Sequence, residues 1–573
     1  MTATRMTART ALRVLAALEE LKRRPGTGEA AILRALIALS RSRLHDAESL
    51  IRLHETLLFL RAYPPSARVR HQVDAMLRSF AERVARLGDS GGNLSPLDEV
   101  EVSGIAGTAV TSNFSYAIVR WLVATHPNQV AIDWDWFDDD DRFGSTMPRF
   151  LPLLEEDALV EAHVPYRDWL RAASGRRNEL AWLVERFESL KLPDHAKGKL
   201  FDALTLHIRW TFGVGTSRTG MIRPTRRLFF HRTPLIKRSA VSLTGEFGSL
   251  SIPVQRLSPV AGERILDLAR GTSAVRYREL HGFTHGDSRR VLKADFGRGT
   301  EAFVFGVLPE HRLPLRAYHA AVIIKNGVPV AYFEGLSLFE RLESGFNLYY
   351  TFRDGETAWL FGRVLHLMRQ LLGVSVFSID PYQVGRDNEE GIESGAFWFY
   401  RKLGFRPVRP ALVRLTLAEE QRIAASRAYR TPARTLRKLA EGHMLFETPP
   451  PGQLDAGHPW DRFEVRNVGL AVQRRMTHEF AGDADAMRSD SAAHIRRLLG
   501  LETRRWSVAA QQRFEDVALV LAMIPGIERW SAGEKHLAAR IVQAKSRGDE
   551  ARYLRLMQPH ARMRAAVVRF GST

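Results

Sequence analysis

Residues 317–339 read AYHAAVIIKNGVPVAYFEGLSLF and contain two β-rich runs separated by Asn326-Gly327. An Asn-Gly pair between two such runs is the strongest short-range signal for a β-hairpin, because both residues tolerate the positive φ of a two-residue turn. Another β-rich run, SGFNLYYTF, follows at residues 344–352. The stretch therefore predicts a hairpin followed by a third strand.

The neighbouring segments extend this pattern over residues 249–416. In chain order they are the strand LSIPVQRLS (250–258), the helix AGERILDLARG (261–271), the hairpin and third strand, the helix WLFGRVLHLMRQLL (359–372), the strand VSVFSI (374–379), the helix IESGAFWFYRKL (392–403) and a strand from Phe405. Gly373 and Gly404 are placed to end the last two helices. The segment therefore predicts an α+β domain with a mixed sheet.

The length of 573 residues predicts two to four domains. Residues 1–95 show helical periodicity, and residues 96–248 form a mixed α/β region whose role the sequence does not give. Residues 417–573 return to helices, including TLRKLAEGHMLF at 435–446. We therefore predict a multidomain α+β protein, with helical N- and C-terminal regions around the sheet domain of residues 249–416.

Composition excludes several classes of protein. The chain has no cysteine, so it has no disulfide, thiolate metal site or cysteine nucleophile. No apolar run reaches the length of a membrane span, and no secretory signal is evident, so we predict a cytoplasmic protein without a membrane span. Nucleophile-elbow, Walker and zinc-protease motifs are missing. His281 and His285 are spaced like metal ligands but have no evident third ligand, so no metal site is predicted.

The chain is strongly basic, with 83 Lys+Arg against 64 Asp+Glu and a net charge of +19. Such a charge attracts polyanions. Arginines recur in pairs on the C-terminal helices, as Arg474-Arg475, Arg496-Arg497 and Arg504-Arg505. Two interpretations stay open for these basic helices: a solvated surface, or a face that binds tRNA or another nucleic acid.

The segment AFWFYRKLGFRPV at residues 396–408, placed after these strands and helices, resembles the GNAT N-acyltransferase superfamily. Members of that family commonly carry a helix that ends in Tyr, followed after two or three residues by Leu-Gly-Phe and a final strand; Tyr400, Leu403, Gly404 and Phe405 match this pattern. The resemblance covers residues 249–416 only. It implies a GNAT-like mixed sheet and acetyl-CoA or another acyl-CoA as co-substrate, with an unidentified amine as acceptor.

The turn at residues 353–358, RDGETA, is the predicted binding site for the acyl carrier. A strand that turns tightly into a helix directs unpaired amides and the positive end of the helix dipole at one spot, which suits a pyrophosphate. We predict that Arg353, Gly355, Thr357 and Ala358 bind the carrier. The resemblance places a glycine where this chain has Glu356, whose carboxylate would repel a diphosphate from that position.

The resemblance also implies that Tyr400 is the general acid that reprotonates the leaving thiolate. An alternative is that Tyr400 belongs only to an aromatic core cluster. The family often has Asn seven residues before this Tyr; Glu393 stands at that position here, and Asn388, further upstream, is the predicted contact to the carrier. A carboxylate at a strand end would act as general base, with Glu334 favoured over Asp380, Glu390 and Glu393.

The predicted function is transfer of an acyl group from an acyl-CoA thioester to an amine. One alternative is an aminoacyl-tRNA-dependent transferase of the same fold, which would account for both Glu356 and the positive charge. A further alternative is a non-catalytic protein that binds nucleic acid on a GNAT-like scaffold. The sequence does not give the oligomeric state.

Overall fold

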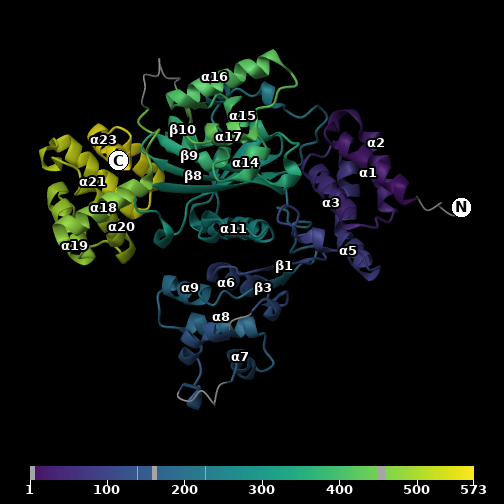
Figure 1. Cartoon of the computed structure of the whole chain (residues 1–573), viewed down its shortest axis with the longest axis horizontal. Coiled ribbons are helices and arrows are strands. Elements are labelled where there is room, and N and C mark those ends of the chain that lie inside the picture. The colour runs from purple at the N-terminus through teal and green to yellow at the C-terminus, as the bar shows by residue number, and fades with distance from the viewer. Residues whose placement is uncertain (1–6, 138–139, 158–163, 226, 449–457, 573) are drawn as a thin grey trace.

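A mixed β-sheet forms the centre of the computed structural model, which describes residues 7–137, 140–157, 164–225, 227–448 and 458–572. Within these residues, nine strands pair in the order β11-β12-β10-β9-β8-β7-β6-β5-β4. The N-terminal helices lie at one end of this sheet and the C-terminal helices at the other, while a smaller lobe lies below (Figure 1). This arrangement confirms a multidomain α+β protein with helical terminal regions.

The strands of the large sheet span residues 254–447. They are β4 (Val254–Arg256), β5 (Leu292–Gly297), β6 (Thr300–Phe305), β7 (Ala317–Lys325), β8 (Val328–Leu338), β9 (Arg341–Leu348), β10 (Val376–Ile379), β11 (Arg406–Pro407) and β12 (Met444–Glu447). Neighbouring strands are antiparallel except β9 and β10, which are parallel.

The predicted hairpin is confirmed as β7 and β8. Its two turn residues, Asn326 and Gly327, have φ angles of 48° and 84°, the combination that a two-residue turn between twisted strands requires. The Asn326 side chain donates a hydrogen bond to the Ala62 carbonyl (2.8 Å) and accepts one from the Phe229 amide (2.8 Å). The turn is therefore fixed to the end of an N-terminal helix.

Different helices cover the two faces of the sheet. One face carries Tyr318 and Tyr332 and is covered by α11 (Pro259–Ala274) and α12 (His281–Thr284). The other carries Phe346, whose ring lies 5.3 Å from that of Phe361 in α13 (Thr357–Leu372). The remaining helices of this region are α10 (Leu243–Phe247), α14 (Glu389–Glu393), α15 (Ala396–Arg401), α16 (Pro410–Ala425) and α17 (Ala433–Leu439).

One continuous hydrophobic core joins the sheet to both helical regions. The N-terminal helices are α1 (Ala8–Lys22), α2 (Glu29–Ser40), α3 (Ala47–Ala62), α4 (Ala67–Arg78) and α5 (Phe80–Asp89). The C-terminal helices are α18 (Val465–Phe480), α19 (Ala484–Leu499), α20 (Val508–Leu521), α21 (Ala532–Arg547), α22 (Glu550–Met557) and α23 (Ala561–Ser572). In the part of the chain that the structure describes, no helix has the length and apolarity to cross a membrane.

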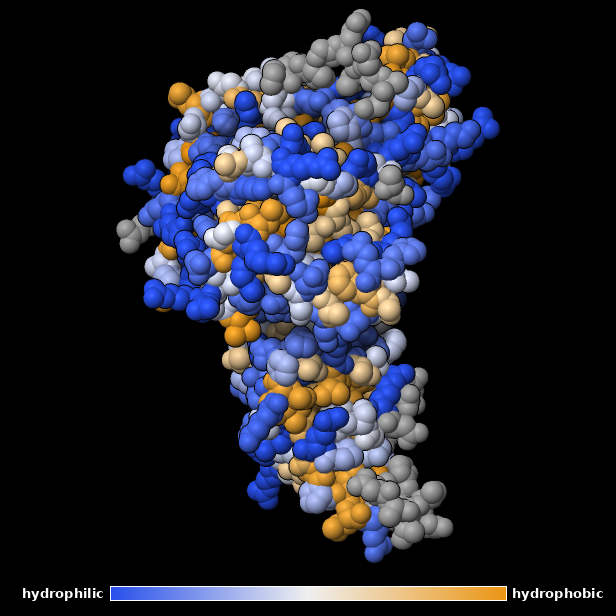
Figure 2. Space-filling view, turned by 90° about the vertical axis from the view of Figure 1, so that its left-hand side faces the viewer, coloured by the Kyte–Doolittle hydropathy of each residue, from blue (hydrophilic) through white to orange (hydrophobic). Residues whose placement is uncertain are grey.

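The lower lobe has a separate core that reaches α11 through Ala274 and Val275. Its small sheet has the order β1-β3-β2, and both outer strands are antiparallel to β3. Figure 2 shows the lobe as a narrower part below the main body. Its elements are β1 (Ala109–Ser112), α6 (Tyr116–Thr125), β2 (Val130–Ile132), α7 (Tyr166–Ser174), α8 (Glu179–Ser189), α9 (Asp194–Asp202) and β3 (Ile208–Thr211).

The large sheet contains three strands that the sequence does not predict, β5, β6 and β12. Strands β5 and β6 form a hairpin that the sequence analysis does not predict. The predicted helix at residues 435–446 is wrong in its second half, because α17 ends at Leu439 and residues 444–447 form β12 between β10 and β11. The sheet therefore continues past residue 416.

His231 makes stability depend on pH. Both its ring nitrogens are buried without a hydrogen-bond partner, and this burial, with the charge of Lys325, lowers the His231 pKa to about 3. The unfolded chain therefore binds this proton more readily below about pH 6.5, so stability falls as the pH falls. At pH 5 the free energy of unfolding is lower by about 2 kcal/mol for this reason.

We expect the free energy of unfolding of His231→Phe to fall less than that of the wild type between pH 7 and pH 5, because phenylalanine has no group to protonate. Urea unfolding at the two pH values measures the difference. An equal loss in both proteins would contradict the prediction.

Candidate active site

A cavity of about 810 Å³ lies where β9 and β10 part. It is bounded by the last residues of β9, the first turn of α13, the segment that follows β10, and α15. Its lining includes Phe346, Asn347, Leu348, Arg353, Gly355, Thr357, Ala358, Gln383, Asn388 and Tyr400. The structure thus brings together in one cavity all five residues predicted to bind the carrier and the predicted acid.

The cavity forms because β9 continues beyond the residues that pair with β10. The parallel register runs from Arg341 opposite Val376 to Glu343 opposite Ser378 and stops there. Strand β9 continues to Leu348, while the chain after Ile379 turns at Pro381 into a short 3₁₀ helix. Proline has no amide hydrogen and cannot continue a ladder. The edge of β9 from residue 344 onward therefore has no neighbouring strand on this side among the described residues.

The turn from β9 into α13 brings backbone amides to the cavity. Helix α13 begins at Thr357, and its cap residue, Glu356, makes no side-chain cap hydrogen bond. The first amides of a helix lack intrahelical acceptors and carry the positive end of the dipole. A Cβ at Gly355 would lie 2.6 Å from the Tyr63 hydroxyl, so only glycine fits this turn.

Glu356 faces away from the cavity. Its carboxylate is fully buried and pairs with Lys325 (3.1 Å) and with Arg298. It also accepts a hydrogen bond from the Ile236 amide (3.2 Å). Burial alone would raise the pKa of Glu356, but Lys325 and Arg298 outweigh burial and hold the pKa below its ordinary value. The Glu356 carboxylate therefore does not line the cavity, and its charge is balanced by Lys325 and Arg298.

The rim of the cavity is cationic. Its carboxylates are already paired, Asp354 with Arg23 (3.2 Å) and Glu390 with Arg353. The basic residues that line it are Arg23, Arg24, Lys237, Arg238 and Arg353. Basic side chains therefore outnumber acidic ones here, which favours an anionic ligand.

Tyr400 lines the cavity from α15. Its ring packs against those of Phe361 (5.7 Å) and Phe405 (5.8 Å), and the residue is 5% exposed. Burial raises the pKa of Tyr400 above its ordinary value, so the phenol is neutral at physiological pH. No described residue forms a hydrogen bond with its hydroxyl. The ring therefore belongs to the core, as the alternative interpretation expects, while the residue also faces the cavity.

Asn388 lines the cavity, and its side-chain amide also makes hydrogen bonds within the chain. Its Oδ1 accepts a hydrogen bond from the Gly391 amide (3.3 Å), and its Nδ2 donates one to the Tyr382 carbonyl (3.0 Å). The side chain thus caps α14 and shapes the wall of the cavity, and both ends of its amide are engaged within the chain.

Glu334 is not brought to the cavity. Its carboxylate accepts a hydrogen bond from the Tyr318 hydroxyl, which itself accepts one from the Gly282 amide of α12 (3.0 Å). Glu334 thus lies on the sheet face that α11 and α12 cover. A strand has two faces, and the sequence alone does not tell which of them a cavity adjoins.

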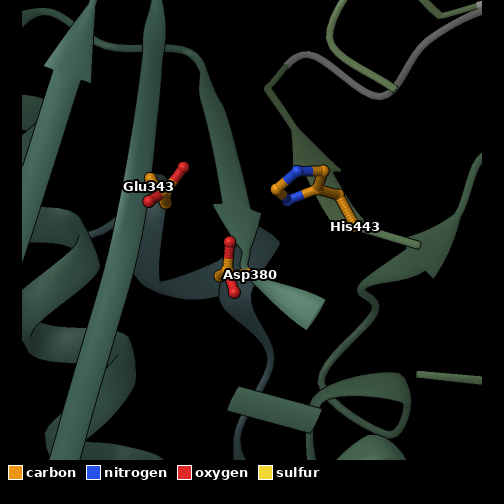
Figure 3. Close-up of side chains that lie close together, drawn as sticks. All are labelled: Glu343, Asp380 and His443. Atoms are coloured by element: carbon orange, nitrogen blue, oxygen red, sulfur yellow. The ribbon is translucent and has the colours of Figure 1, made fainter. Parts of the chain in front are cut away.

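Three other side chains meet at the start of the gap between the strands. Glu343 of β9, Asp380 after β10 and His443 before β12 have ligand atoms within 4.8 Å of one another (Figure 3). They line a second cavity of about 390 Å³. Asp380 is among the carboxylates that the sequence indicates. Glu343 is not, because the predicted third strand begins at Ser344, and His443 is not, because the sequence does not predict β12.

The neighbours of this cluster disfavour a metal ion there. Arg341 pairs with Glu343 (3.1 Å) and lies 3.4 Å from His443 Nδ1. Burial, together with the charge of Arg341, lowers the pKa of His443 to about 3. One carboxylate and one imidazole nitrogen are therefore engaged by a guanidinium. Among the described residues, the Asp380 carboxylate accepts a hydrogen bond only from the Tyr382 amide (2.8 Å).

No family model, no curated protein and no solved structure matches this chain.

Proposed function

We propose that this protein is an N-acyltransferase that moves an acyl group from an acyl-CoA thioester to an amine. One observation carries the proposal: the predicted carrier-binding turn and Tyr400 line a single cavity at the point where two parallel strands part. The turn lies 42 or more positions before Tyr400 in the chain, so their meeting depends on the fold.

The sheet supports a GNAT-like fold for residues 249–416. In that family the acyl carrier enters between two parallel strands that separate, followed by a helix that receives its pyrophosphate. Here β9 and β10 are parallel and part after Glu343, and α13 follows β9.

Two parts of the cavity would bind two parts of the acyl carrier. Arg353, Lys237 and the first turn of α13 would hold the phosphates of the carrier, because amides at a helix start and cationic side chains both favour phosphate. The free edge of β9 would bind its amide-containing arm. The thioester supplies the activated acyl group.

The reaction then requires an acid and a base. The amine nitrogen bonds to the acyl carbon as the carbon–sulfur bond breaks; Tyr400 gives a proton to the sulfur, and a carboxylate takes one from the nitrogen. We assign the base to Asp380. It lines the second cavity, at the point where the strands part, and no cationic side chain among the described residues is paired with it.

Acetyl-CoA titration of the full chain tests the proposal. Specific binding stabilises the folded state by mass action, so the midpoint of thermal unfolding should rise with ligand concentration. We expect Arg353→Ala to weaken binding about tenfold, since it removes a charged donor. Arg414→Ala, which changes an exposed arginine outside the cavity, is the matched control. No shift of the wild-type midpoint at millimolar acetyl-CoA would contradict the proposal.

A second pair of variants tests the base. Asp380→Asn keeps the hydrogen bond from the Tyr382 amide but removes the charge, so we expect the rate of thiol release with an amine acceptor to fall about tenfold or more. Glu343 lies close enough to replace it in part. Glu334→Gln should change the rate by less than about twofold, because Glu334 is directed at Tyr318. A larger effect at Glu334 than at Asp380 would reverse the assignment.

The aminoacyl-tRNA-dependent alternative predicts a different outcome. An arginine-lined cavity beside the C-terminal helices favours a nucleic-acid partner. Transfer from charged tRNA, with no binding of acetyl-CoA, would select this alternative.

A further inference from the structure

The C-terminal helices enclose a cavity that the proposed transfer does not use. It has a volume of about 1140 Å³ and lies between α20, α21 and the loops at residues 287–290 and 309–312, at one end of the sheet. Two carboxylates, Asp287 and Glu502, contribute to its lining. The arginines that line it are Arg256, Arg289, Arg290, Arg312, Arg504, Arg505, Arg513 and Arg547. Positive charge is thus concentrated in a concave site, where fields are strongest.

Most of this charge has no counter-ion among the described residues. Asp287 is 1% exposed and lies within 4 Å of three guanidinium groups, those of Arg289, Arg290 and Arg312. Arg513 donates to the carbonyls of Arg312 and Pro309, and its buried Nε has no partner. In the part of the chain that the structure describes, no carboxylate pairs with the remaining four, Arg256, Arg504, Arg505 and Arg547.

Crowded guanidinium groups repel one another. Burial lowers the pKa of Arg312, and the charges of Arg290 and Arg513 lower it further. An arrangement of this kind costs stability in the free protein and is relieved by a bound polyanion. The two arginines that the sequence indicated at 504 and 505 are both exposed in this cavity.

The cationic surface continues into a second cavity and contains an aromatic ring. A neighbouring cavity of about 710 Å³ shares Arg504 and Trp506 with the first one and adds Arg488 and Arg496. Together the two exceed the roughly 300–1,000 Å³ of a small-ligand pocket. The half-buried Trp506 lies between them, and an aromatic side chain beside arginines is the combination that binds single-stranded nucleic acid, through base stacking and phosphate contacts.

Other anions fit less well. An acidic peptide would pair with the arginines but has no flat rings to stack on Trp506, and a duplex hides its bases within its own stack. We infer that the two cavities around residues 502–507 bind a single-stranded nucleic acid, with Arg504 and Arg505 on phosphates and Trp506 against a base. This inference does not depend on the acyltransferase proposal.

Fluorescence anisotropy of the full chain with a labelled single-stranded RNA of about twelve nucleotides tests the inference. Affinity should fall with salt, and Arg504→Glu/Arg505→Glu should weaken binding at least about tenfold and reduce the salt slope by about 1.4, or about 0.7 for each lost phosphate contact. The matched control is Arg9→Glu/Arg13→Glu, the same charge change at exposed positions on α1. The control should stay within about twofold.

Trp506 tests the stacking contact separately. Trp506→Ala should weaken binding roughly tenfold, while Trp506→Phe, which keeps a ring, should retain most of the affinity. Thermal unfolding of each variant shows whether it is folded.

Other polyanions test whether the site is specific for single-stranded nucleic acid. Single-stranded DNA of the same sequence tells whether the chain distinguishes RNA from DNA, and preference for either one agrees with the inference. It would be overturned by equal losses in the two charge-reversal variants, by polyglutamate or a duplex binding as tightly as the single strand, or by the absence of binding at low salt.

Discussion

Replacing Tyr400 with Phe is expected to lower the rate constant of acyl transfer by about 10²- to 10⁴-fold, the usual contribution of a positioned general acid. The substitution removes only the hydroxyl, and no described residue forms a hydrogen bond with that hydroxyl. The ring contacts with Phe361 and Phe405 stay in place. Acetyl-CoA binding and the midpoint of thermal unfolding should therefore be unchanged. Thiol release from acetyl-CoA with a panel of amines measures the rate.

Tyr350→Phe is the matched control, because Tyr350 is 51% exposed and lies outside the lining of the cavity. It should change the rate by less than about twofold. If Tyr400→Phe left the rate unchanged as well, Tyr400 would be a core residue only, and another proton donor would be required.

Local patterns in the sequence locate much of this site. A strand followed by a tight turn and an amphipathic helix is recognisable over about twenty residues, and a helix that ends before Leu-Gly-Phe is recognisable over fewer. The structure brings Arg353, Gly355 and Tyr400, the residues that these two patterns indicate, to one cavity. The Asn-Gly hairpin is confirmed for the same reason, since its turn chemistry is contained in two residues.

The remaining parts depend on contacts between distant segments. Alternation along β8 places Glu334 on one face of the strand, but the choice between faces is made by the helices that pack there. His443 reaches the cluster only because β12 pairs with β10, and the three-residue apolar run Met444–Phe446 fits a helix or a strand equally well. Glu356 appears in the sequence as an obstacle to phosphate, because its partners Lys325 and Arg298 lie on other strands or turns.

Replacing Lys325 with Met should lower the free energy of unfolding by about 3–5 kcal/mol, because it leaves the buried Glu356 carboxylate without its main partner. Lys325 Nζ lies 3.1 Å from Glu356 and donates to the Arg298 carbonyl (2.7 Å). Burial lowers the pKa of Lys325 to about 8, although the charge of Glu356 favours the protonated form. Lys293→Met is the matched control, because its partly exposed pair with Glu301 should contribute less than about 1 kcal/mol.

The double variant Lys325→Met/Glu356→Leu tests the reason for this loss. Removing both charges leaves apolar side chains of similar volume, so we expect it to recover most of the stability that Lys325→Met loses. Urea unfolding of the four proteins of this cycle gives the coupling energy. Acetyl-CoA affinity should stay within about threefold in the double variant, because Glu356 faces away from the cavity. Stronger binding, by tenfold or more, would instead show that the carboxylate opposes the carrier.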